Sequence, residues 1–273
     1  ERLRLGHVQH GRAERIAAKQ RAVAERMGSG SKLVERYAKQ FNDAYWIAEP
    51  DDIIAMNLTQ LDRARAKELD AHTEYYAARG ATLVTVIAAD HPGLFYRIAG
   101  GIHLAGGNII DARIHTTRGG MAVDNFLVQD PLGRPFSEDS QLARIETTIA
   151  EALGGKIKLV PQLAARPSAR PRADAFDVRP GVEFDNAASN RFTVIEVNAR
   201  DRPALLNRLA RALFEAKLMV HSAHIATYGE RAVDTFYVTD LLGEKVDSAT
   251  RLKAVEKKLL EAAEEQTVEV AAA

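Results

Sequence analysis

The sequence predicts an α+β fold in which two βαββαβ units follow one another, preceded by a helical segment. Two observations support this prediction. The stretch 82–99 is repeated at 192–210, and the stretch 122–133 is repeated at 232–243. Around both copies, β-branched apolar runs alternate with segments of helical periodicity. These are duplicated domains rather than solenoid units, since solenoid repeats have periods of roughly 20–50 residues.

Residues 1–78 are predicted to be helical. Long side chains recur every three or four residues along one face: Ile54, Leu58, Leu61, Arg65, Leu69, His72 and Tyr76. Asp51 and Asp52 follow a proline, and acidic residues favour a helix start. An earlier helix is predicted over 13–27, with a flexible break at Gly28-Ser29-Gly30-Ser31.

An aromatic cluster lies between these two helices. It consists of Phe41, Tyr45 and Trp46. Aromatic side chains mostly contribute buried area, so the cluster is predicted to pack against a neighbouring domain.

The first βαββαβ unit is predicted over residues 80–161. Its expected elements are a strand at 81–89, a helix to Ala105, a hairpin of 108–117 and 121–130, a helix at 137–153 and a strand at Lys156–Val160. Residues 162–190 form a proline-containing linker. Its second half alternates apolar residues, from Phe176 through Phe184, and predicts an extra strand.

The second unit is predicted over residues 191–273 with the same order of elements. It ends in a helix at Ser248–Ala263 and a strand at Thr267–Val270. We expect the two units to pack side by side, within one chain or between two chains.

The loop after the first strand of each unit is the candidate ligand-binding feature. Pro92 suits the first position of a helix, which would leave the N–H groups of Gly93, Leu94 and Phe95 available to a carboxylate. Asp90 beside them can accept hydrogen bonds from an ammonium group. Donors for a carboxylate next to an acceptor for an amine predict binding of a free amino acid.

Other residues near this loop could either bind the ligand or have a purely structural role. Asn108 begins the returning strand, and its amide offers both a donor and an acceptor. His91 and Arg202 occupy the same position in the two copies, either near the ligand or as exposed loop side chains. Asp90 and Asp201 could equally cap helices without binding anything.

A second pair of acids, Asp124 and Asp234, lies in matching hairpins between apolar residues. These carboxylates either hold a turn or pair with the helix residues Arg97 and Arg208. Their positions favour a structural role.

Composition and motifs exclude several functions. The 37 basic and 37 acidic residues cancel, which argues against nucleic acid as a partner, and the lack of cysteine excludes disulfides and thiol chemistry. No apolar stretch is long enough for a membrane span. No nucleophile or nucleotide-binding motif occurs, and His221 and His224 alternate to opposite faces of a strand, so we predict no catalytic residue and no metal site.

RNA-recognition domains share the βαββαβ order and are an alternative. They require stacking aromatic residues on the central strands and basic surroundings. The central strands here carry Asp124 and Asp234 instead, which disfavours this alternative.

The motif Asp-x-Pro-Gly-Leu at 90–94, with Asn108-Ile109 opening the second strand, resembles the ferredoxin-like ACT domain. The resemblance implies a regulatory module that binds an amino acid. It implies the ligand residues Asp90, His91, Gly93, Leu94, Asn108 and Ile109, and a possible second site at Asp201, Arg202, Ala204, Leu205 and Val220. The second copy departs from the pattern, since Ala204 replaces glycine and Met219 replaces asparagine.

Four longer stretches resemble the C-terminal part of bifunctional PII uridylyltransferase/uridylyl-removing enzymes. They are 6–28, 44–53, 90–130 and 185–240. The resemblance implies a cytoplasmic, glutamine-sensing regulatory region in nitrogen metabolism. The chain itself would be non-catalytic and free of cofactors, and residues 1–78 would follow the hydrolase domain.

The resemblance also implies the partners and activities of a whole enzyme. A nucleotidyltransferase domain, with magnesium, would uridylylate the PII signal protein, and a hydrolase domain would remove the UMP. The chain begins at Glu1 and its first methionine is Met27, so we expect a piece of a longer polypeptide. The alternative is the ACT-type regulatory tail of an amino-acid biosynthetic enzyme.

Overall fold

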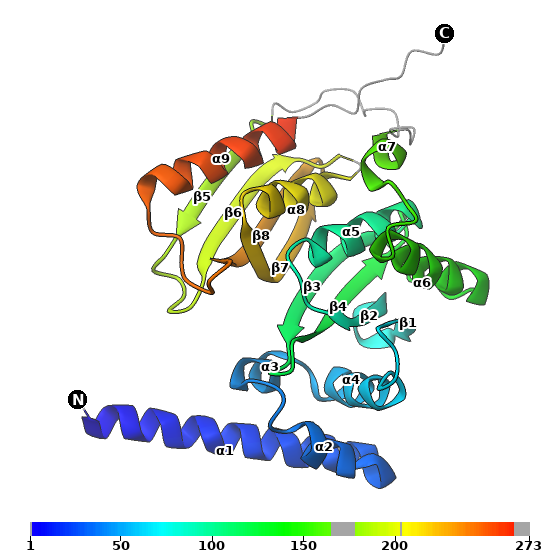
Figure 1. The fold of residues 1–273 in the computed structure, drawn as a ribbon, viewed down its shortest axis with the longest axis vertical. Helices are drawn as coiled ribbons and strands as arrows, with labels where there is room; N and C mark the ends of the chain where they lie inside the picture. The colour runs from blue at the N-terminus through cyan, green and yellow to red at the C-terminus, as the bar shows by residue number, and fades with distance from the viewer. Residues whose placement is uncertain (1, 165–177, 203, 265–273) are drawn as a thin grey trace. The chain divides into compact units, whose positions relative to one another are not determined.

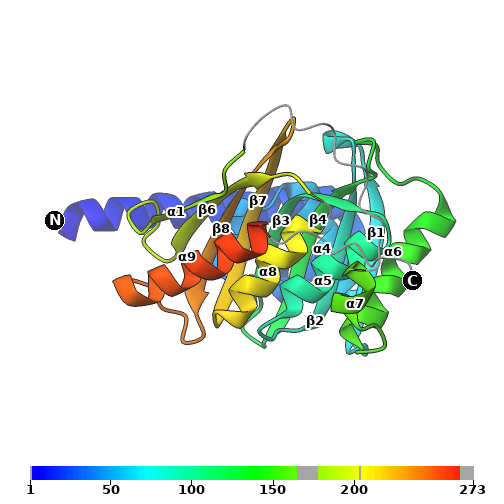
Figure 2. The ribbon, with the colours of Figure 1, turned by 90° about the horizontal axis from the view of Figure 1, so that it is seen from above.

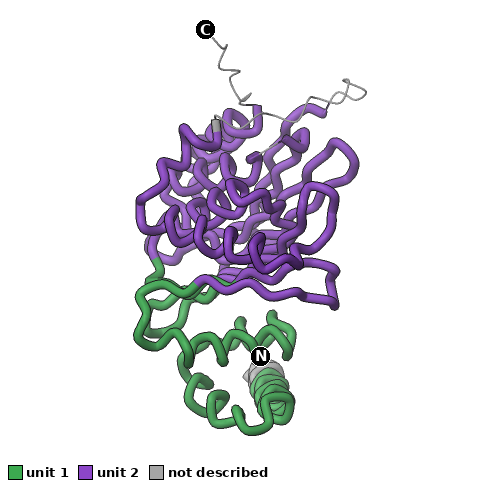
Figure 3. The backbone as a smooth tube through the Cα atoms, turned by 90° about the vertical axis from the view of Figure 1, so that its right-hand side faces the viewer, with its two compact units in different colours: residues 1–70, 85–90, 115–123 green, residues 71–84, 91–114, 124–273 purple. Residues whose placement is uncertain are grey.

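The structure is a computed structural model that describes residues 2–164, 178–202 and 204–264. It divides into two compact units, coloured green and purple in Figure 3. Unit 1 comprises residues 1–70, 85–90 and 115–123, and unit 2 comprises residues 71–84, 91–114 and 124–273.

Unit 1 contains four α-helices and one 3₁₀ turn among its described residues. They are α1 (Arg2–Met27), η1 (Gly28–Gly30), α2 (Lys32–Tyr37), α3 (Asp43–Ala48) and α4 (Asp51–Arg63). The expected break after Met27 is therefore the turn η1. On α3, the Asn42 side chain accepts a hydrogen bond from the Tyr45 N–H at 3.1 Å and caps the helix.

The aromatic cluster is buried in the core of unit 1. Phe41 and Tyr45 stack with their ring centroids 3.8 Å apart, and Trp46 meets Tyr45 edge-on at 5.6 Å. Ile87 and Val123 belong to the same core. The aromatic side chains are buried as predicted, but they form part of the core of unit 1 itself instead of packing against a neighbouring compact unit.

The predicted continuation of the helix to Tyr76 is wrong. Helix α4 ends at Arg63, and Leu69–Tyr76 form strand β1, followed by the 3₁₀ turn η2 (Ala77–Arg79). The helical spacing of Leu69, His72 and Tyr76 misled the prediction, because this segment also carries the threonine and tyrosines that favour strands.

The eight strands form one sheet in the order β1-β2-β4-β3-β7-β8-β6-β5 (Figure 1). Their bounds, after β1, are β2 (Ala81–Ala89), β3 (Asn108–Thr116), β4 (Met121–Gln129), β5 (Gly181–Asp185), β6 (Thr193–Arg200), β7 (Leu218–Tyr228) and β8 (Arg231–Asp240). Strands β3 and β7 are antiparallel, with Ala112 opposite Ala223. One strand from each repeat therefore joins the two halves of the sheet.

The remaining helices belong to unit 2. They are α5 (Leu94–Leu104), α6 (Asp139–Leu153), α7 (Leu159–Ala164), α8 (Leu205–Glu215) and α9 (Ala249–Glu264). Helices α5, α8 and α9 lie on one face of the sheet (Figure 2), and α5 contacts α6, α7 and α8. The predicted α+β class with two ferredoxin-like units in tandem is confirmed.

One predicted strand of the first repeat is wrong. Lys156–Val160 do not form a strand, because Leu159–Ala164 form α7 and bury Leu159 and Leu163, which are one helical turn apart. The strand predicted at Thr267–Val270 lies outside the described residues.

The outer place beside the first strand of each repeat is taken by a strand that precedes it in sequence. Strand β1 lies beside β2, and β5 lies antiparallel to β6 with Val182 opposite Val197. The extra strand predicted in the linker is thus confirmed as β5, whereas Phe176 lies outside the described residues. No helix among the described residues is long and apolar enough to cross a membrane.

Candidate functional site

The loop between β2 and α5 differs from its prediction at the helix start. Gly93 adopts a left-handed conformation with φ of 92°, and the helix begins at Leu94 rather than at Pro92. The Leu94 N–H donates to the His91 carbonyl at 3.1 Å. The prediction that this N–H is available to a ligand carboxylate is therefore wrong, because the tight turn uses it first.

The second repeat builds the same loop without a glycine. Ala204 has a φ of 60°, and the Leu205 N–H donates to the Arg202 carbonyl at 3.1 Å. The geometry is thus duplicated, although alanine adopts left-handed conformations less readily than glycine. The substitution of Ala204 for glycine does not abolish the loop.

Replacing Gly93 by alanine is expected to destabilise the protein. A Cβ at Gly93 would lie 3.0 Å from the Phe214 ring, and the left-handed backbone adds strain. We expect Gly93→Ala to lower the free energy of unfolding by about 1–2 kcal/mol. Urea unfolding measures this change. The matched variant Ala204→Gly relieves the strain but loosens the unfolded chain, so we expect it to change stability by less than about 1 kcal/mol; equal losses in the two variants would contradict this account.

The other predicted ligand residues of unit 2 differ in exposure. His91 is exposed, with Nδ1 2.9 Å from the Pro92 carbonyl oxygen, and Asn108 is exposed at the start of β3. Leu94 and Ile109 are buried. The side chains of these two residues belong to the core, which leaves only their backbone for a ligand.

Asp90 belongs to unit 1, where its carboxylate already has a donor. The Thr116 hydroxyl donates to Asp90 Oδ2 at 2.6 Å, and the Asp90 N–H donates to the Gly120 carbonyl at 2.9 Å. The sequence patterns did not indicate Thr116, because it ends β3, 26 positions from Asp90, which follows β2.

The start of α5 lies against the second repeat. The Tyr96 and Phe214 rings are 5.2 Å apart, and the Asn207 amide donates to the Tyr96 carbonyl at 2.8 Å. Gly93 borders both rings. One predicted binding residue, Gly93, therefore lies where the two repeats meet, beside aromatic side chains that the repeated motif does not indicate.

Asp201 of the possible second site, in unit 2, interacts electrostatically with another acid, Asp234, which was not predicted to belong to that site. Asp234 is 2% exposed, and no donor among the described residues bonds its Oδ1. Burial raises the pKa of Asp234 to about 7, with a further contribution from the charge of Asp201. The Arg202 guanidinium bonds the Glu264 carbonyl at 3.3 Å, and Val220 is partly buried on β7.

The raised pKa of Asp234 predicts a pH dependence of stability. The folded state holds the proton more tightly than the unfolded state, so this contribution is complete below about pH 4 and is lost as the pH rises through about 7. The asparagine side chain in Asp234→Asn would not titrate, so the free energy of unfolding of this variant should rise relative to that of the wild type as the pH increases. We expect this relative gain to be about 2–3 kcal/mol on going from pH 5 to pH 8. Chemical unfolding of both proteins at the two pH values measures this gain, and parallel profiles would refute it.

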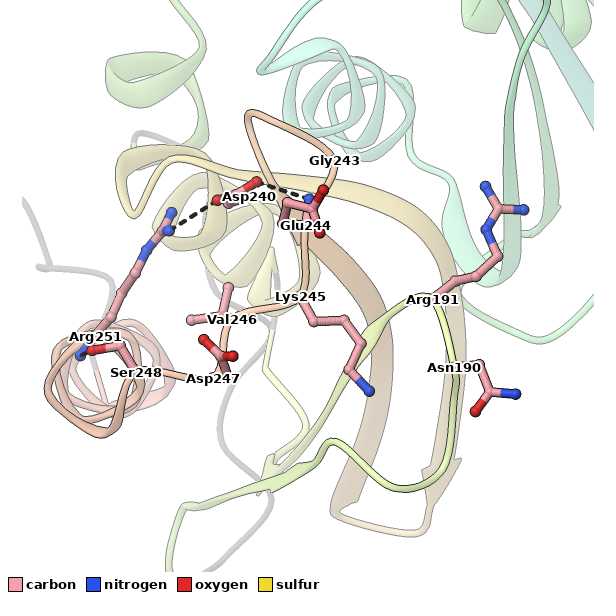
Figure 4. Close-up of a pocket in the computed structure, with 10 residues that line it drawn as sticks. All are labelled: Asn190, Arg191, Asp240, Gly243, Glu244, Lys245, Val246, Asp247, Ser248 and Arg251. Carbon is pink, nitrogen blue, oxygen red and sulfur yellow. Dashed lines mark hydrogen bonds and ion pairs between the residues drawn. The ribbon is translucent and has the colours of Figure 1, made fainter.

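A cavity of about 550 Å³ lies elsewhere in unit 2, and none of the predicted binding residues lines it (Figure 4). Lys245 Nζ donates to the carbonyls of Asn186 and Ser189 at 2.6 and 2.8 Å. Arg251 pairs with Asp240 at 3.4 Å. Lys245 and Arg251, two cationic side chains that line the cavity, thus hold the surrounding loops together.

The turn that follows β8 forms one wall of this cavity, and the turn that follows β4 has the same hydrogen bonds. Asp240 Oδ1 accepts from the Leu242 and Glu244 N–H groups at 2.8 and 2.9 Å, and Asp130 makes the equivalent two bonds in the first repeat. The Glu244 N–H, above all, lowers the pKa of Asp240. Lys245 is at the position of Pro135, so the cavity's basic character is specific to the second repeat.

No group of three or more potential metal-ligating side chains occurs in the described part of the chain. The His221 ring nitrogen Nε2 lies 2.9 Å from the Thr239 hydroxyl, and the ring stacks on Phe192.

Comparison with known proteins identifies the repeated module. Residues 188–266 match the family model of the ACR family N-terminal ACT domain. The chain is 73% identical over 272 residues to the bifunctional uridylyltransferase/uridylyl-removing enzyme of Novosphingobium aromaticivorans, covering 100% of this chain and 30% of that protein. This chain is a relative of the C-terminal, ACT-domain part of these enzymes.

Two more relatives carry the same description. The protein of Erythrobacter litoralis is 63% identical, with 96% of this chain and 29% of that protein covered. The protein of Zymomonas mobilis is 48% identical, with 93% of this chain and 28% of that protein covered. The chain thus spans less than a third of the length of these relatives.

Proposed function

We propose that this chain is the regulatory, glutamine-sensing region of an enzyme that uridylylates and deuridylylates the PII signal protein. Glutamine binds at the loop Asp90–Leu94 and at Asn108 and Ile109. The observation that carries the proposal is the position of Gly93. This residue has a left-handed backbone and borders the Tyr96 and Phe214 rings, which belong to different ACT domains. Because glycine has no Cβ, its backbone is open to a ligand at this contact.

Each end of the amino acid has a partner of suitable chemistry. The Asp90 carboxylate accepts from the ligand ammonium group in place of the Thr116 hydroxyl. The exposed Asn108 amide donates to an oxygen of the ligand. The Leu94 N–H takes no part, since it is bonded within the loop.

Pairing of the two ACT domains along β3 and β7 gives this site its second wall. A ligand shifts a conformational equilibrium only by its different affinities for the two states. A site bordered by both domains meets this requirement, because its shape changes whenever their packing changes. The whole enzyme, in the cytoplasm and with magnesium at its nucleotidyltransferase domain, would read out this change.

Calorimetric titration of the chain with glutamine tests the proposal, with glutamate and asparagine as matched ligands. We expect saturable heat with glutamine and weaker binding of the other two. Absence of heat with glutamine but binding of another amino acid would favour the alternative, the regulatory tail of an amino-acid biosynthetic enzyme. One or two equivalents bound would show whether Asp201, Arg202 and Ala204 form a second site.

A further inference from the structure

We propose that Thr116 and His115, adjacent on β3, couple the amino-acid loop to the helices of unit 1. Thr116 contacts Asp90 on one side, and His115 contacts Glu49 at the end of α3 on the other. We call these four residues the β3 clamp. The inference rests on the proposed function for its ligand, whereas the clamp itself is a set of contacts within unit 1.

The first half of the clamp fixes the end of β2. The hydroxyl of Thr116 lies 2.6 Å from Asp90 Oδ2, a short bond that is typical of a hydroxyl donating to a carboxylate. The Asp90 N–H bonds the Gly120 carbonyl at 2.9 Å, so backbone and side chain of Asp90 are both tied to the β3–β4 hairpin. A ligand ammonium group that bonds Asp90 Oδ2 competes with the Thr116 hydroxyl for this oxygen.

The second half of the clamp is a buried contact between an imidazole ring and a carboxyl group. His115 Nε2 lies 2.7 Å from Glu49 Oε1, and the Glu49 side chain is 0% exposed. The Tyr45 ring meets the His115 ring edge-on at 4.9 Å, and the Asn57 amide donates to the Tyr45 hydroxyl at 3.1 Å. Burial raises the pKa of Tyr45, so this hydroxyl stays neutral beside the Glu49 carboxylate.

Strand geometry explains why one segment makes both contacts. Successive residues of a strand point to opposite faces, so Thr116 and His115 reach different partners. The hairpin is also anchored through its backbone, since the Arg118 N–H donates to the Gln40 carbonyl at 2.8 Å. A shift of Thr116 on ligand binding is therefore transmitted to His115 and onward to Glu49.

The second repeat lacks this connection. At the 111-residue offset that relates Asp90 to Asp201, Thr116 matches Thr227, but His115 matches Ala226. The turn that follows is one residue shorter in the second repeat. The contact between histidine and a buried glutamate is thus specific to the first repeat, which makes that repeat the one that signals to the helices.

Hydrogen exchange of the chain, with and without glutamine, tests the clamp. We expect Glu49→Gln to speed exchange of the amides of 86–90 and 116–120 without ligand, and to change glutamine affinity by about fivefold or more. The control Glu215→Gln removes an exposed glutamate paired with Arg211 and is expected to leave both measurements unchanged. Wild-type exchange at 86–90 in folded Glu49→Gln would overturn the inference.

A second variant keeps the test decisive if Glu49→Gln does not fold. Thr116→Val breaks the bond to Asp90, and we expect faster exchange both at 86–90 and at 43–48, the residues of α3. An effect confined to 86–90 would overturn the coupling. The matched variant Thr227→Val is expected to leave 43–48 unchanged. Since these arms need no ligand, failure of wild-type protein to bind glutamine would refute the proposed function separately.

Discussion

Replacing His115 by alanine is expected to lower the free energy of unfolding by about 3 kcal/mol, because it removes a partner of a fully buried carboxylate. The substitution also deletes a ring that packs against Tyr45. Guanidinium unfolding followed by fluorescence of Trp46, which is buried in the same core, measures this loss directly.

His72→Ala is the matched control for this prediction. His72 also faces a glutamate, with Nδ1 3.6 Å from Glu146 Oε1, but its side chain is 40% exposed. Exposed pairs contribute little, so we expect a loss of less than about 1 kcal/mol. Similar losses in the two variants would show that burial of Glu49 does not set the strength of the His115 contact.

Asp90→Ala is expected to weaken glutamine binding by about 10–100-fold, since a hydrogen bond to a charged group contributes roughly 1.5–3 kcal/mol. The variant leaves the Asp90 N–H and its bond to Gly120 in place. Titration calorimetry measures the affinity. Asp201→Ala removes the equivalent carboxylate of the second repeat and should leave binding at the first site unchanged. A larger loss in Asp201→Ala would place the main site in the second repeat.

Local sequence patterns predicted most of the fold. Ala81–Ala89 was predicted as a strand and is β2, and the hairpin of β3 and β4 turns where the glycines of 118–120 indicated. Periodicity failed at Leu69–Tyr76, where residues three and four apart coincide with strand-forming types. It also failed at Leu159–Ala164, where an apolar pair one helical turn apart formed a helix instead of a strand.

The candidate site was only partly predictable. The motif located Asp90, Gly93 and Asn108, but it placed the helix start at Pro92 because a positive φ cannot be read from residue types alone. Thr116 and Phe214 come from segments distant in sequence. Only the fold shows Thr116 bonded to Asp90, and only the contact between repeats shows Phe214 at Gly93.

The sequence gives no indication that His115 pairs with Glu49, because 66 positions separate the two residues. Neither residue belongs to the repeated motif. Comparison of the repeats could have pointed to His115, because the second copy has an alanine there.

Backbone amide chemical shifts recorded during a glutamine titration would show which residues respond to the amino acid. We expect saturable shifts first at Gly93, Asn108 and Ile109, with smaller ones at His115 and in α3. Absence of shifts with glutamine, or shifts confined to the cavity at Lys245 and Arg251, would contradict this expectation.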